Sequence, residues 1–372
     1  MTDLNLADNA IVVSLDFGGF DTNEDIHEIT QLTISAGFEV AELVTSKRAT
    51  PHTKYFIGSG KLEEILLMKD SLKADILIFN HELTPSQERN IEKMTGMRVY
   101  DRTALILFIF SLRAKTYEGK LQVELAHLDH LSTRLVKGWS HLERQKGGIG
   151  IRGGPGEKQI ELDRRMLGLR IKQLKEKLRK LGQQRSMQRR ARKRSQALSI
   201  SIVGYTNAGK STLFNRLTHE SIFAEDKLFA TLDTTSRKLF IESGHSVVIS
   251  DTVGFIKDLP TTLIEAFKST LEEVTDSDLL VHVVDVSNEN KSEQINEVGK
   301  ILEEINAHNL PQILVLNQID KINLKTSCER DDYGKINHIQ LSAKTGDGIE
   351  FLKQAMVEYN QTRINQRNGH YA

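Results

Sequence analysis

The sequence predicts an α/β protein with three parts. A small N-terminal parallel α/β domain with a long antiparallel helical hairpin precedes a doubly wound, mixed-sheet domain that carries a phosphate loop. Three observations predict this order: strand and helix patterns alternate over residues 1–115, helical heptads dominate residues 116–196, and the alternation returns over residues 197–360. Residues 361–372 are expected to be a flexible polar tail.

Length and composition exclude several classes of protein. At 372 residues the chain suits two or three domains, and 39% hydrophobic with 27% charged residues is typical of a soluble globular protein. Apolar runs such as Leu105–Phe110 are too short to span a membrane, and acids rather than a basic region begin the chain, so neither a transmembrane segment nor a secretory signal is expected. The single cysteine, Cys328, excludes internal disulfides and favours a cytoplasmic protein.

The first 115 residues are expected to form a small parallel sheet covered by helices. Strands are expected near Asn9–Asp16, Glu39–Thr45, Ala74–Phe79 and Arg98–Tyr100, and helices near Asp25–Ala36, Lys61–Leu72 and Ser86–Met94. The segment Ile57–Lys61 resembles a phosphate loop, but Tyr55 replaces the required first glycine and Leu62 replaces the Ser or Thr. We expect an ordinary strand-to-helix turn there.

A glycine-rich segment, Gly147–Gly156, separates two helical stretches at Thr103–Arg144 and Glu157–Arg194. The second stretch has a heptad seam at Leu167, Ile171, Leu174, Leu178 and Leu181. Two long helices joined by a loop predict an antiparallel hairpin with the glycine segment at its tip. The tip contains G-x-G-x-x-G at Gly148–Gly153, but a charged helix precedes it instead of a strand, which excludes a dinucleotide-binding turn.

Charge is strongly segregated although the formal net charge is zero. Met1–Ser46 contains nine acids and no Lys or Arg, whereas Arg164–Arg194 contains fourteen Lys or Arg and one acid, Glu176. Such a basic helix indicates a polyanionic partner, the alternative being a solvated coiled-coil face. Aromatic residues do not interleave the basic ones, which favours contact with the backbone of structured RNA over stacking on single-stranded bases.

The segment Gly204–Ser211 fits the phosphate-loop pattern G-x-x-x-x-G-K-[ST] between a β-branched run and a helix start. Glycines allow backbone N–H groups to turn around phosphate oxygens, and the helix N-terminus adds a positive dipole. Lys210 is expected to bridge the β- and γ-phosphates, and Ser211 to ligate Mg²⁺. The expected phosphate-binding residues are Gly204, Tyr205, Thr206, Asn207, Ala208, Gly209, Lys210, Ser211 and Thr212.

The remaining elements of residues 197–360 predict a doubly wound sheet, which binds its ligand at the carboxyl ends of the strands. Strands are expected near Leu198–Val203, Arg237–Ile241, Ser246–Ser250, Leu279–Val284, Gln312–Leu316 and His338–Leu341. Helices are expected near Lys210–Thr218, Thr262–Glu273, Lys291–Ile305 and Gly348–Tyr359.

Two motifs in this domain are typical of loops that sense a γ-phosphate. Thr231 is expected to complete a Mg²⁺ shell with Ser211, and Asp251 to hold the metal through water. The Gly254 N–H is expected to meet the γ-phosphate, so that triphosphate orders both loops and hydrolysis releases them. Lys210, Thr231 and Gly254 are therefore the expected catalytic residues. The two motifs comprise Phe229, Ala230, Thr231, Leu232, Asp233, Asp251, Thr252, Val253 and Gly254.

Two further motifs predict recognition of guanine. The Asp320 carboxylate can accept hydrogen bonds from both N1–H and N2–H₂ of guanine, which adenine cannot offer, and the Ala343 N–H can meet guanine O6. The motifs comprise Asn317, Gln318, Ile319, Asp320, Ser342, Ala343 and Lys344. Five motifs in this order predict a Mg²⁺-dependent enzyme that binds GTP and hydrolyses it to GDP and phosphate.

Residues 197–360 resemble translation-factor-type GTPases, and the whole chain resembles the HflX family of ribosome-associated GTPases. The distinctive segments are Phe56–Lys61, Glu118–Ala126, Gly147–Glu157, Asp163–Arg165, Gly204–Phe214, Phe229–Asp233 and Asp251–Ile256. The resemblance implies the large ribosomal subunit as partner, with the Gly147–Gly156 tip near the peptidyl-transferase region and the Arg164–Arg194 helix on rRNA. It also implies that the protein dissociates stalled or idle ribosomes.

Several positions depart from the family pattern. Gln318 replaces the lysine of Asn-Lys-x-Asp, whose stem normally covers the base, so a lower nucleotide affinity is expected. Arg152–Gly156 contains one additional glycine, and only residues 361–372 follow the last expected helix, where some members carry a further domain. Phe255 stands where many GTPases have the glutamine that orients water, which predicts slow hydrolysis without the ribosome.

Three alternatives stay open beside a ribosome-splitting GTPase. The protein could be a GTP-dependent assembly factor for the large subunit, or an ATP-driven RNA remodelling enzyme, for which Gln318 leaves room. A peripheral membrane regulator is the third alternative, although the basic helix lacks Trp or Phe for insertion into a membrane surface. A monomer is expected.

Overall fold

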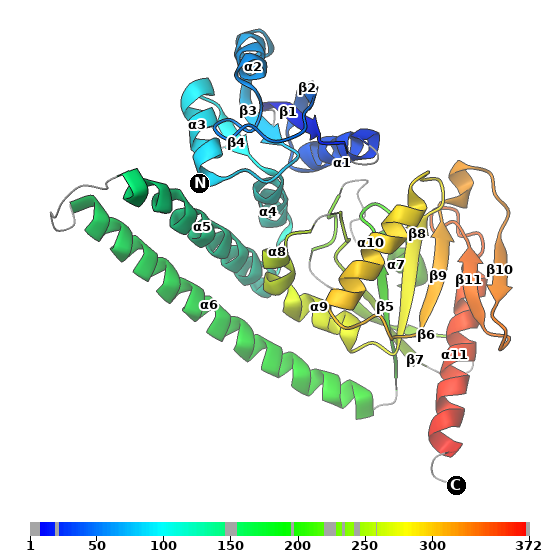
Figure 1. Ribbon diagram of the computed structural model, residues 1–372. Helices are drawn as coiled ribbons and strands as arrows, with labels where there is room; N and C mark the ends of the chain where they lie inside the picture. The colour runs from blue at the N-terminus through cyan, green and yellow to red at the C-terminus, as the bar shows by residue number, and fades with distance from the viewer. Residues whose placement is uncertain are drawn as a thin grey trace. The chain divides into compact units, whose positions relative to one another are not determined.

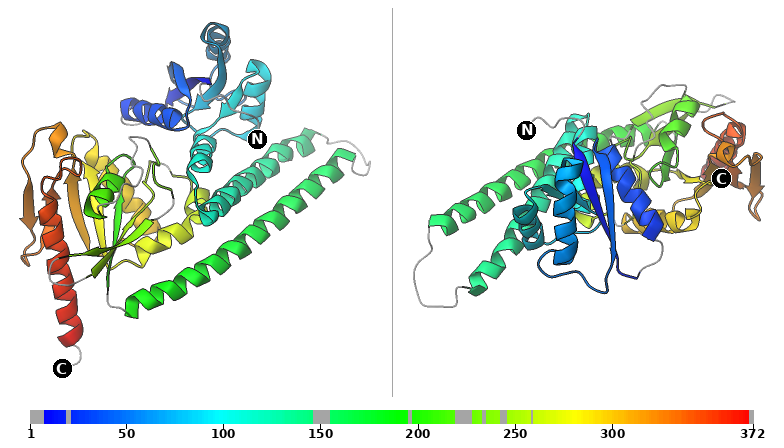
Figure 2. Two further views of the ribbon diagram at one scale, coloured as in Figure 1. Left: turned by 180° about the vertical axis from the view of Figure 1, so that it is seen from behind. Right: turned by 90° about the horizontal axis from the view of Figure 1, so that it is seen from above.

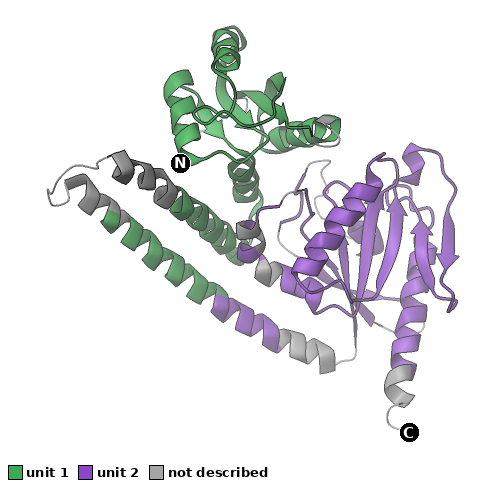
Figure 3. Ribbon diagram, in the orientation of Figure 1, with its two compact units in different colours: residues 1–178 green, residues 179–372 purple. Residues whose placement is uncertain are grey.

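The computed structural model describes residues 8–18, 22–145, 155–194, 197–218, 228–232, 235–241, 246–257 and 259–369. Within these ranges, the side chains at 22, 135–145, 155–160, 163, 188–194, 261–262, 264, 268–270 and 366–369 are outside the description. The chain divides into two compact units, residues 1–178 (unit 1) and 179–372 (unit 2) (Figure 3).

Unit 1 contains a four-stranded sheet in the order β2-β1-β3-β4, with every neighbouring pair parallel (Figure 1). Its strands are β1 (Asn9–Asp16), β2 (Glu39–Lys47), β3 (Ala74–Phe79) and β4 (Arg98–Tyr100), and its helices include α1 (Thr22–Ser35), α2 (Ser59–Leu72), α3 (Pro85–Thr95) and α4 (Arg102–Arg113). The central strands β1 and β3 are almost entirely buried, as expected for parallel strands covered on both faces. The predicted parallel sheet is confirmed.

Local capping explains where two helices of unit 1 begin. Thr84 and Gln87 form a reciprocal capping box at the start of α3. Asp101 precedes α4, and its Oδ1 accepts a hydrogen bond of 2.8 Å from the Ala104 N–H. Both caps follow the carboxyl ends of strands, so they hold polar side chains at one edge of the sheet.

The helical hairpin consists of α5 (Tyr117–Gln145) and α6 (Pro155–Arg194), and the part of α6 that belongs to unit 1 runs beside α5 in both views (Figure 2), joined to it by ion pairs of Arg170 with Glu124 and of Lys175 with Asp129. The heptad seam of α6 is turned away from solvent: Leu174 is fully buried, and Leu167, Ile171 and Leu178 are half-buried. The expected single helix over Thr103–Arg144 is instead two helices, α4 and α5. They are separate because Thr116 caps α5, with its Oγ1 accepting a 2.9 Å hydrogen bond from the Gly119 N–H.

Unit 2 contains a seven-stranded mixed sheet in the order β10-β11-β9-β8-β5-β7-β6. The edge strands β10 and β6 are antiparallel to their neighbours, and the inner pairs are parallel. The strands are β5 (Leu198–Gly204), β6 (Thr235–Phe240), β7 (Ser246–Asp251), β8 (Leu279–Asp285), β9 (Gln312–Asn317), β10 (Ser327–Arg330) and β11 (Ile336–Gln340). This arrangement confirms the predicted mixed sheet and adds β10, which the sequence analysis did not predict.

The described helices of unit 2 are α7 (Lys210–Thr218), α8 (Thr261–Ala266), α9 (Lys268–Thr275), α10 (Lys291–Glu304) and α11 (Ile349–Gly369), with a short 3₁₀ helix at Ile319–Lys321. The expected helix over Thr262–Glu273 is divided into α8 and α9 at Phe267. Residues 361–369, expected as part of a polar tail, instead continue α11. An ion pair of 2.9 Å between Arg363 and Asp278 ties this extension to unit 2.

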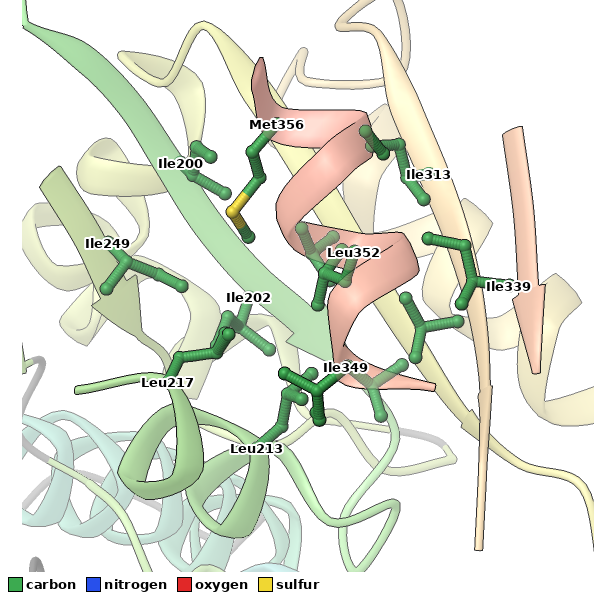
Figure 4. Close-up of a cluster of buried hydrophobic side chains, with 14 of the residues drawn as sticks. Ile200, Ile202, Leu213, Leu217, Ile249, Ile313, Ile339, Ile349, Leu352 and Met356 are labelled. Atoms are coloured by element: carbon green, nitrogen blue, oxygen red, sulfur yellow. The ribbon is translucent and has the colours of Figure 1, made fainter. Parts of the chain in front are cut away.

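The core of unit 2 fixes the loop between β5 and α7. Figure 4 shows Ile202 of β5 beside Leu217 of α7 and Ile200 of β5 beside Met356 of α11, and these four side chains and Leu213 of α7 are fully buried. Each buried side chain of this size contributes about 1.5–3 kcal/mol to folding. The packing therefore holds Gly204–Gly209 at the carboxyl edge of the sheet, where parallel α/β folds bind ligands.

Among the helices that the structure describes, none combines the length and the apolar character needed to cross a membrane.

Candidate functional site

A pocket of about 410 Å³ lies at the carboxyl edge of the unit 2 sheet. It is lined by Thr206, Asn207, Gly209, Lys210, Ser211, Thr212, Phe229, Ala230, Thr231, Thr252, Gly254, Asn317, Gln318, Asp320, Lys321, Ala343 and Lys344. These residues come from all five predicted motifs, so the fold brings the motifs to one place.

Two glycines of the phosphate loop are required by their surroundings. A Cβ at Gly204 (φ +149°) would lie 2.2 Å from the Val283 carbonyl oxygen, and a Cβ at Gly209 (φ +89°) would lie 2.3 Å from Asn317 Nδ2. No side chain fits at such distances, and L-residues rarely adopt these φ values. The loop therefore approaches β8 and the Asn317 side chain more closely than any other residue type would allow.

Lys210 is buried, and its Nζ donates a 2.6 Å hydrogen bond to the Tyr205 carbonyl oxygen. Burial lowers the pKa of Lys210 to about 8, and attraction from Asp251 opposes this shift. A cation held inside the loop in this way is suited to binding phosphate. The anionic phosphate oxygens would stabilise the charged ammonium, which burial disfavours.

The three predicted metal ligands meet in a triangle. Ser211 Oγ lies 2.7 Å from Asp251 Oδ2 and 2.7 Å from Thr231 Oγ1, and Thr231 Oγ1 donates to Asp251 Oδ2 at 3.0 Å. Ser211 lies in the first turn of α7, Thr231 lies in the loop after α7, and Asp251 ends β7. Elements distant in the chain thus supply one cluster of oxygen atoms.

The chemistry of this cluster fits Mg²⁺, which prefers hard oxygen ligands and usually has only one or two carboxylates beside waters and phosphates. Burial raises the pKa of Asp251, while hydrogen bonds from Ser211 and Thr231 and the charge of Lys210 lower it. Asp251 Oδ1 is buried and has no hydrogen-bond partner within the described residues. A bound cation would compensate the negative charge on this oxygen. Among the described residues, no cluster of three or more His, Cys, Asp or Glu side chains could hold a metal ion.

The phosphate loop and the two loops that carry the guanine motifs are joined to one another by hydrogen bonds. Asn317 Nδ2 donates to the Ala208 carbonyl at 2.9 Å, and Asn317 Oδ1 accepts from the Ala343 N–H at 2.9 Å. The Ser342 hydroxyl donates to Asp320 Oδ1 at 2.6 Å. The Asp320 carboxylate is thereby held in the pocket wall, where it could accept hydrogen bonds from a guanine base.

The predicted site residues that do not line the pocket are buried behind it: Gly204, Tyr205, Ala208, Leu232, Asp251, Val253, Ile319 and Ser342. Asp233 lies outside the described residues. Lys321 lines the pocket but was not predicted. Its position directly after the Asn317–Asp320 motif was the available signal, and its Nζ lies 3.6 Å from Asp285 Oδ2.

The segment after the Asp251–Gly254 motif is tied to the phosphate loop. The Phe255 N–H donates to the Gly204 carbonyl at 3.2 Å, the Thr206 N–H donates to the Phe255 carbonyl at 2.8 Å, and the Lys257 N–H donates to the Tyr205 hydroxyl at 2.8 Å. Phe255 is 1% exposed and does not line the pocket. Its ring is therefore part of the core, where it cannot orient a water molecule.

The predicted RNA-binding surface is described only in part. Residues 146–154 of the tip and the side chains at 188–194 lie outside the described residues. Along the described part of α6, Arg164, Arg165 and Lys172 are exposed, and Arg170 forms an ion pair of 2.6 Å with Glu124.

Comparison with known proteins relates this site to a family. Three family models match the chain: "GTP-binding GTPase N-terminal" at residues 23–111, "GTP-binding GTPase Middle Region" at 113–192 and "50S ribosome-binding GTPase" at 199–318. The chain is 48% identical over 352 residues to GTPase HflX of Escherichia coli (strain K12), which covers 94% of this chain and 82% of that protein. The chain belongs to the HflX family of GTPases. GTPase HflX of Magnetococcus marinus is 45% identical over 329 residues, covering 88% of this chain and 76% of that protein.

Solved structures share the fold of this HflX-family chain. The crystal structure of an SsGBP and GDP complex matches with a TM-score of 0.53 and 25% identity, and covers 95% of this chain and 99% of that chain. A GTP-binding protein from Sulfolobus solfataricus in complex with GDP matches with a TM-score of 0.50, 25% identity and the same coverage. The family and the phosphate-loop fold identify this protein as a guanine-nucleotide-binding GTPase that hydrolyses GTP.

Proposed function

We propose that this GTPase binds the large ribosomal subunit in its GTP state, dissociates stalled or idle ribosomes, and leaves after hydrolysis. The observation that carries the proposal is the exposed basic surface of α6 in the same chain as a nucleotide switch. The match to the "50S ribosome-binding GTPase" model over residues 199–318 supports it. The Gly147–Gly156 tip and the Arg164–Arg194 helix are the proposed rRNA contacts. A ribosomal partner implies a cytoplasmic location, and the proposed acting form is a monomer.

The switch would depend on the Ser211, Thr231 and Asp251 cluster. Mg²⁺ bound there, through water in the case of Asp251, would neutralise charge on the β- and γ-phosphates. The hydroxyl of Thr231 is bonded to both other members of the cluster, so it couples its loop to the phosphate loop. Loss of the γ-phosphate would remove the contacts that hold the Thr231 loop in place. The GTP and GDP states would then differ in their affinity for the ribosomal partner.

Lys210, Thr231 and Gly254 are the proposed catalytic residues. The buried ammonium of Lys210 lies beside the loop that would hold the β- and γ-phosphates, and the Gly254 N–H is proposed to donate to the γ-phosphate. The base would be read by Asp320 and the Ala343 N–H. Phe255 occupies the position where many GTPases have a glutamine that orients the attacking water, and its ring is buried. The free protein is therefore proposed to hydrolyse GTP slowly, and ribosome docking is proposed to accelerate the reaction.

The test is GTP turnover by the free protein and with large ribosomal subunits across a salt series. We expect a manyfold stimulation that salt abolishes, because contacts with phosphates release counterions. The double variant Arg164→Gln/Arg165→Gln should weaken the stimulation, and the matched exposed pair Lys325→Gln/Lys335→Gln should not. Turnover of free protein at tens per second, or no response to subunits, contradicts the proposal.

A second assay separates the alternatives by following assembled ribosomes in a sucrose gradient. Conversion to free subunits with GTP supports a splitting role. Stimulation by subunits without any splitting favours the assembly-factor alternative. Equal displacement of bound nucleotide by ADP and GDP would favour an ATP-driven enzyme, because Asp320 discriminates between the bases only if it reads N1 and N2 of guanine.

A further inference from the structure

Arg216 of α7 holds two consecutive carbonyls of the loop that follows β11. Its Nε donates to the Ala343 carbonyl oxygen at 3.1 Å, and its Nη2 donates to the Lys344 carbonyl oxygen. Ala343 and Lys344 belong to the second guanine motif, and both line the pocket. Arg216 lies at the surface and does not line the pocket, so any effect on a bound nucleotide has to act through this loop.

The helix that carries Arg216 is a firm support for this contact. Leu213 and Leu217, on either side of Arg216 in the sequence of α7, are fully buried in the core of unit 2. The planar guanidinium presents its N–H donors in a fixed fork, which suits two neighbouring acceptors. A Cβ on Gly346 (φ +98°) would lie 3.6 Å from Arg216 Cζ, so the guanidinium also lies against the turn that closes the loop.

Arg216 supplies hydrogen bonds that the loop does not make by itself. The Gly346 N–H donates to the Ser342 carbonyl at 2.8 Å, which closes the loop. Among the described residues, the Ala343 and Lys344 carbonyls have no hydrogen-bond donor other than Arg216. Loss of the arginine would therefore leave the orientation of these two peptides without this restraint.

The bonds from Arg216 determine where the following N–H groups point, because the carbonyl and the N–H of a trans peptide point in opposite directions. The Thr345 N–H follows the Lys344 carbonyl and donates to Ser342 Oγ at 3.1 Å. Ser342 Oγ donates in turn to Asp320 Oδ1 at 2.6 Å. The Thr345 N–H thus points away from Arg216 and towards the side of the loop that holds Asp320.

The same reasoning applies to the peptide between Ala343 and Lys344. Its carbonyl faces Arg216, so the Lys344 N–H faces away from Arg216. This N–H has no hydrogen-bond partner in the part of the chain that the structure describes, whereas the Ala343 N–H donates to Asn317 Oδ1 at 2.9 Å. Because Lys344 lines the pocket, its N–H is available to an acceptor on a bound base.

We infer that Arg216 is a positioning residue for base recognition, which orients the Ala343–Lys344 peptide so that the Lys344 N–H meets the keto oxygen O6 of guanine beside the Ala343 N–H. The inference rests on the proposed reading of guanine in this pocket and is independent of the ribosomal partner. It gives α7, the helix that follows the phosphate loop, a role in recognition of the base.

The experiment measures two dissociation constants for the full chain and for Arg216→Met. The probes are GDP and 2-aminopurine riboside 5′-diphosphate, which lacks O6. Met retains an unbranched apolar stem but has no N–H donor. We expect Arg216→Met to weaken GDP binding about fivefold, because the hydrogen bond to O6 is lost, and to change binding of the 2-aminopurine nucleotide by less than about twofold.

Two controls make the result interpretable. Arg330 also donates to a backbone carbonyl, that of Gly334, and pairs with Glu358 outside the pocket, so Arg330→Met should leave both dissociation constants unchanged. The unchanged protein has to prefer GDP over the 2-aminopurine nucleotide. Equal binding of the two probes by the unchanged protein would contradict the proposed reading of the base, and the inference would fail with it.

The decisive comparison is the preference for GDP in the unchanged protein and in Arg216→Met. A fall in this preference, with binding of the 2-aminopurine nucleotide retained, supports the inference. If the unchanged protein prefers GDP and Arg216→Met keeps the same preference, the inference is overturned, whether both affinities are unchanged or both fall equally. The arginine would then have no role in orienting a donor towards O6.

Discussion

The two sheets of this protein both end their parallel strands in polar residues but use them differently. In unit 1 these residues pair with one another: Arg102 forms a buried ion pair with Glu28 and donates a 2.8 Å hydrogen bond to Asn80 Oδ1. Asp101 accepts from Arg134 Nη1 at 2.7 Å as well as capping α4. The polar side chains at the carboxyl edge of the first sheet are therefore bound by other side chains of unit 1.

In unit 2 the corresponding edge leaves polar atoms without protein partners. Thr206 Oγ1, Asp251 Oδ1 and Gln318 Oε1 are buried and have no hydrogen-bond partner among the residues described. Unsatisfied buried groups are costly, so they persist where a ligand completes them or where strain is functional. The difference teaches that a polar strand end predicts a site only when the chain does not satisfy it internally. The first two predictions below test whether unit 1 uses these groups for stability and unit 2 for ligands, and the last two test contacts within unit 2.

The largest expected effect is on Lys210. Lys210→Met retains the buried stem but removes the cation that would stabilise the phosphates, so GTP turnover should fall about 100-fold or more. Steady-state hydrolysis by the free protein measures this. Lys353→Met, at an ion pair on α11, is the control and should turn over GTP normally. Activity within twofold in both variants would remove Lys210 from the mechanism.

A substitution of Arg134 tests whether the polar residues of unit 1 serve stability and not ligand binding. Arg134→Met leaves Asp101 and Glu88 without their common cation, so local stability should fall by about 3 kcal/mol, the usual cost of breaking a buried ion pair. Hydrogen exchange of the α4 amides measures the loss, and GDP affinity should not change. The control Arg98→Met removes an ion pair to Asp8 from an exposed arginine and should cost less than about 1 kcal/mol. A large loss of GDP affinity in Arg134→Met would erase the contrast between the units.

His282 predicts a pH dependence confined to unit 2. Burial and the charge of Lys210 lower its pKa to about 4, below the ordinary value near 6.5. Because the folded pKa is depressed, the stability that neutral His282 contributes is complete above about pH 6.5 and is lost as pH falls towards 4, by up to about 3 kcal/mol. The difference in unfolding free energy between the unchanged protein and His282→Leu should therefore shrink as the pH falls. A difference that stays constant with pH for His282→Leu contradicts the prediction.

The smallest expected effect concerns the bond from Lys257 to Tyr205. Tyr205→Phe removes only the hydroxyl that accepts from the Lys257 N–H, so exchange of this amide should accelerate about fivefold, corresponding to about 1 kcal/mol. Tyr359→Phe removes a hydroxyl that donates to the Asp278 carbonyl at 2.8 Å and should leave the Lys257 amide unaffected. Unchanged exchange in Tyr205→Phe would show that the backbone bonds of Phe255 alone hold this segment.

The sequence by itself determined much of the fold and most of the pocket wall. Phosphate binding needs glycines, a lysine and a hydroxyl at set spacing between a strand and a helix. The eight consecutive residues Gly204–Ser211 contain all of them. The β-branched runs likewise specified the two sheets, because burial on both faces requires such residues. The family resemblance read from these motifs is confirmed by the comparisons.

Only the tertiary structure decided which of these polar groups form hydrogen bonds with one another. The triangle of Ser211, Thr231 and Asp251 joins three separate elements, and the bond from Gln318 to Asn207 spans more than one hundred residues. Spacing along the chain carries no information about such contacts, because they depend on packing between elements. For the same reason the division into α8 and α9 and the extension of α11 became visible only in the folded chain.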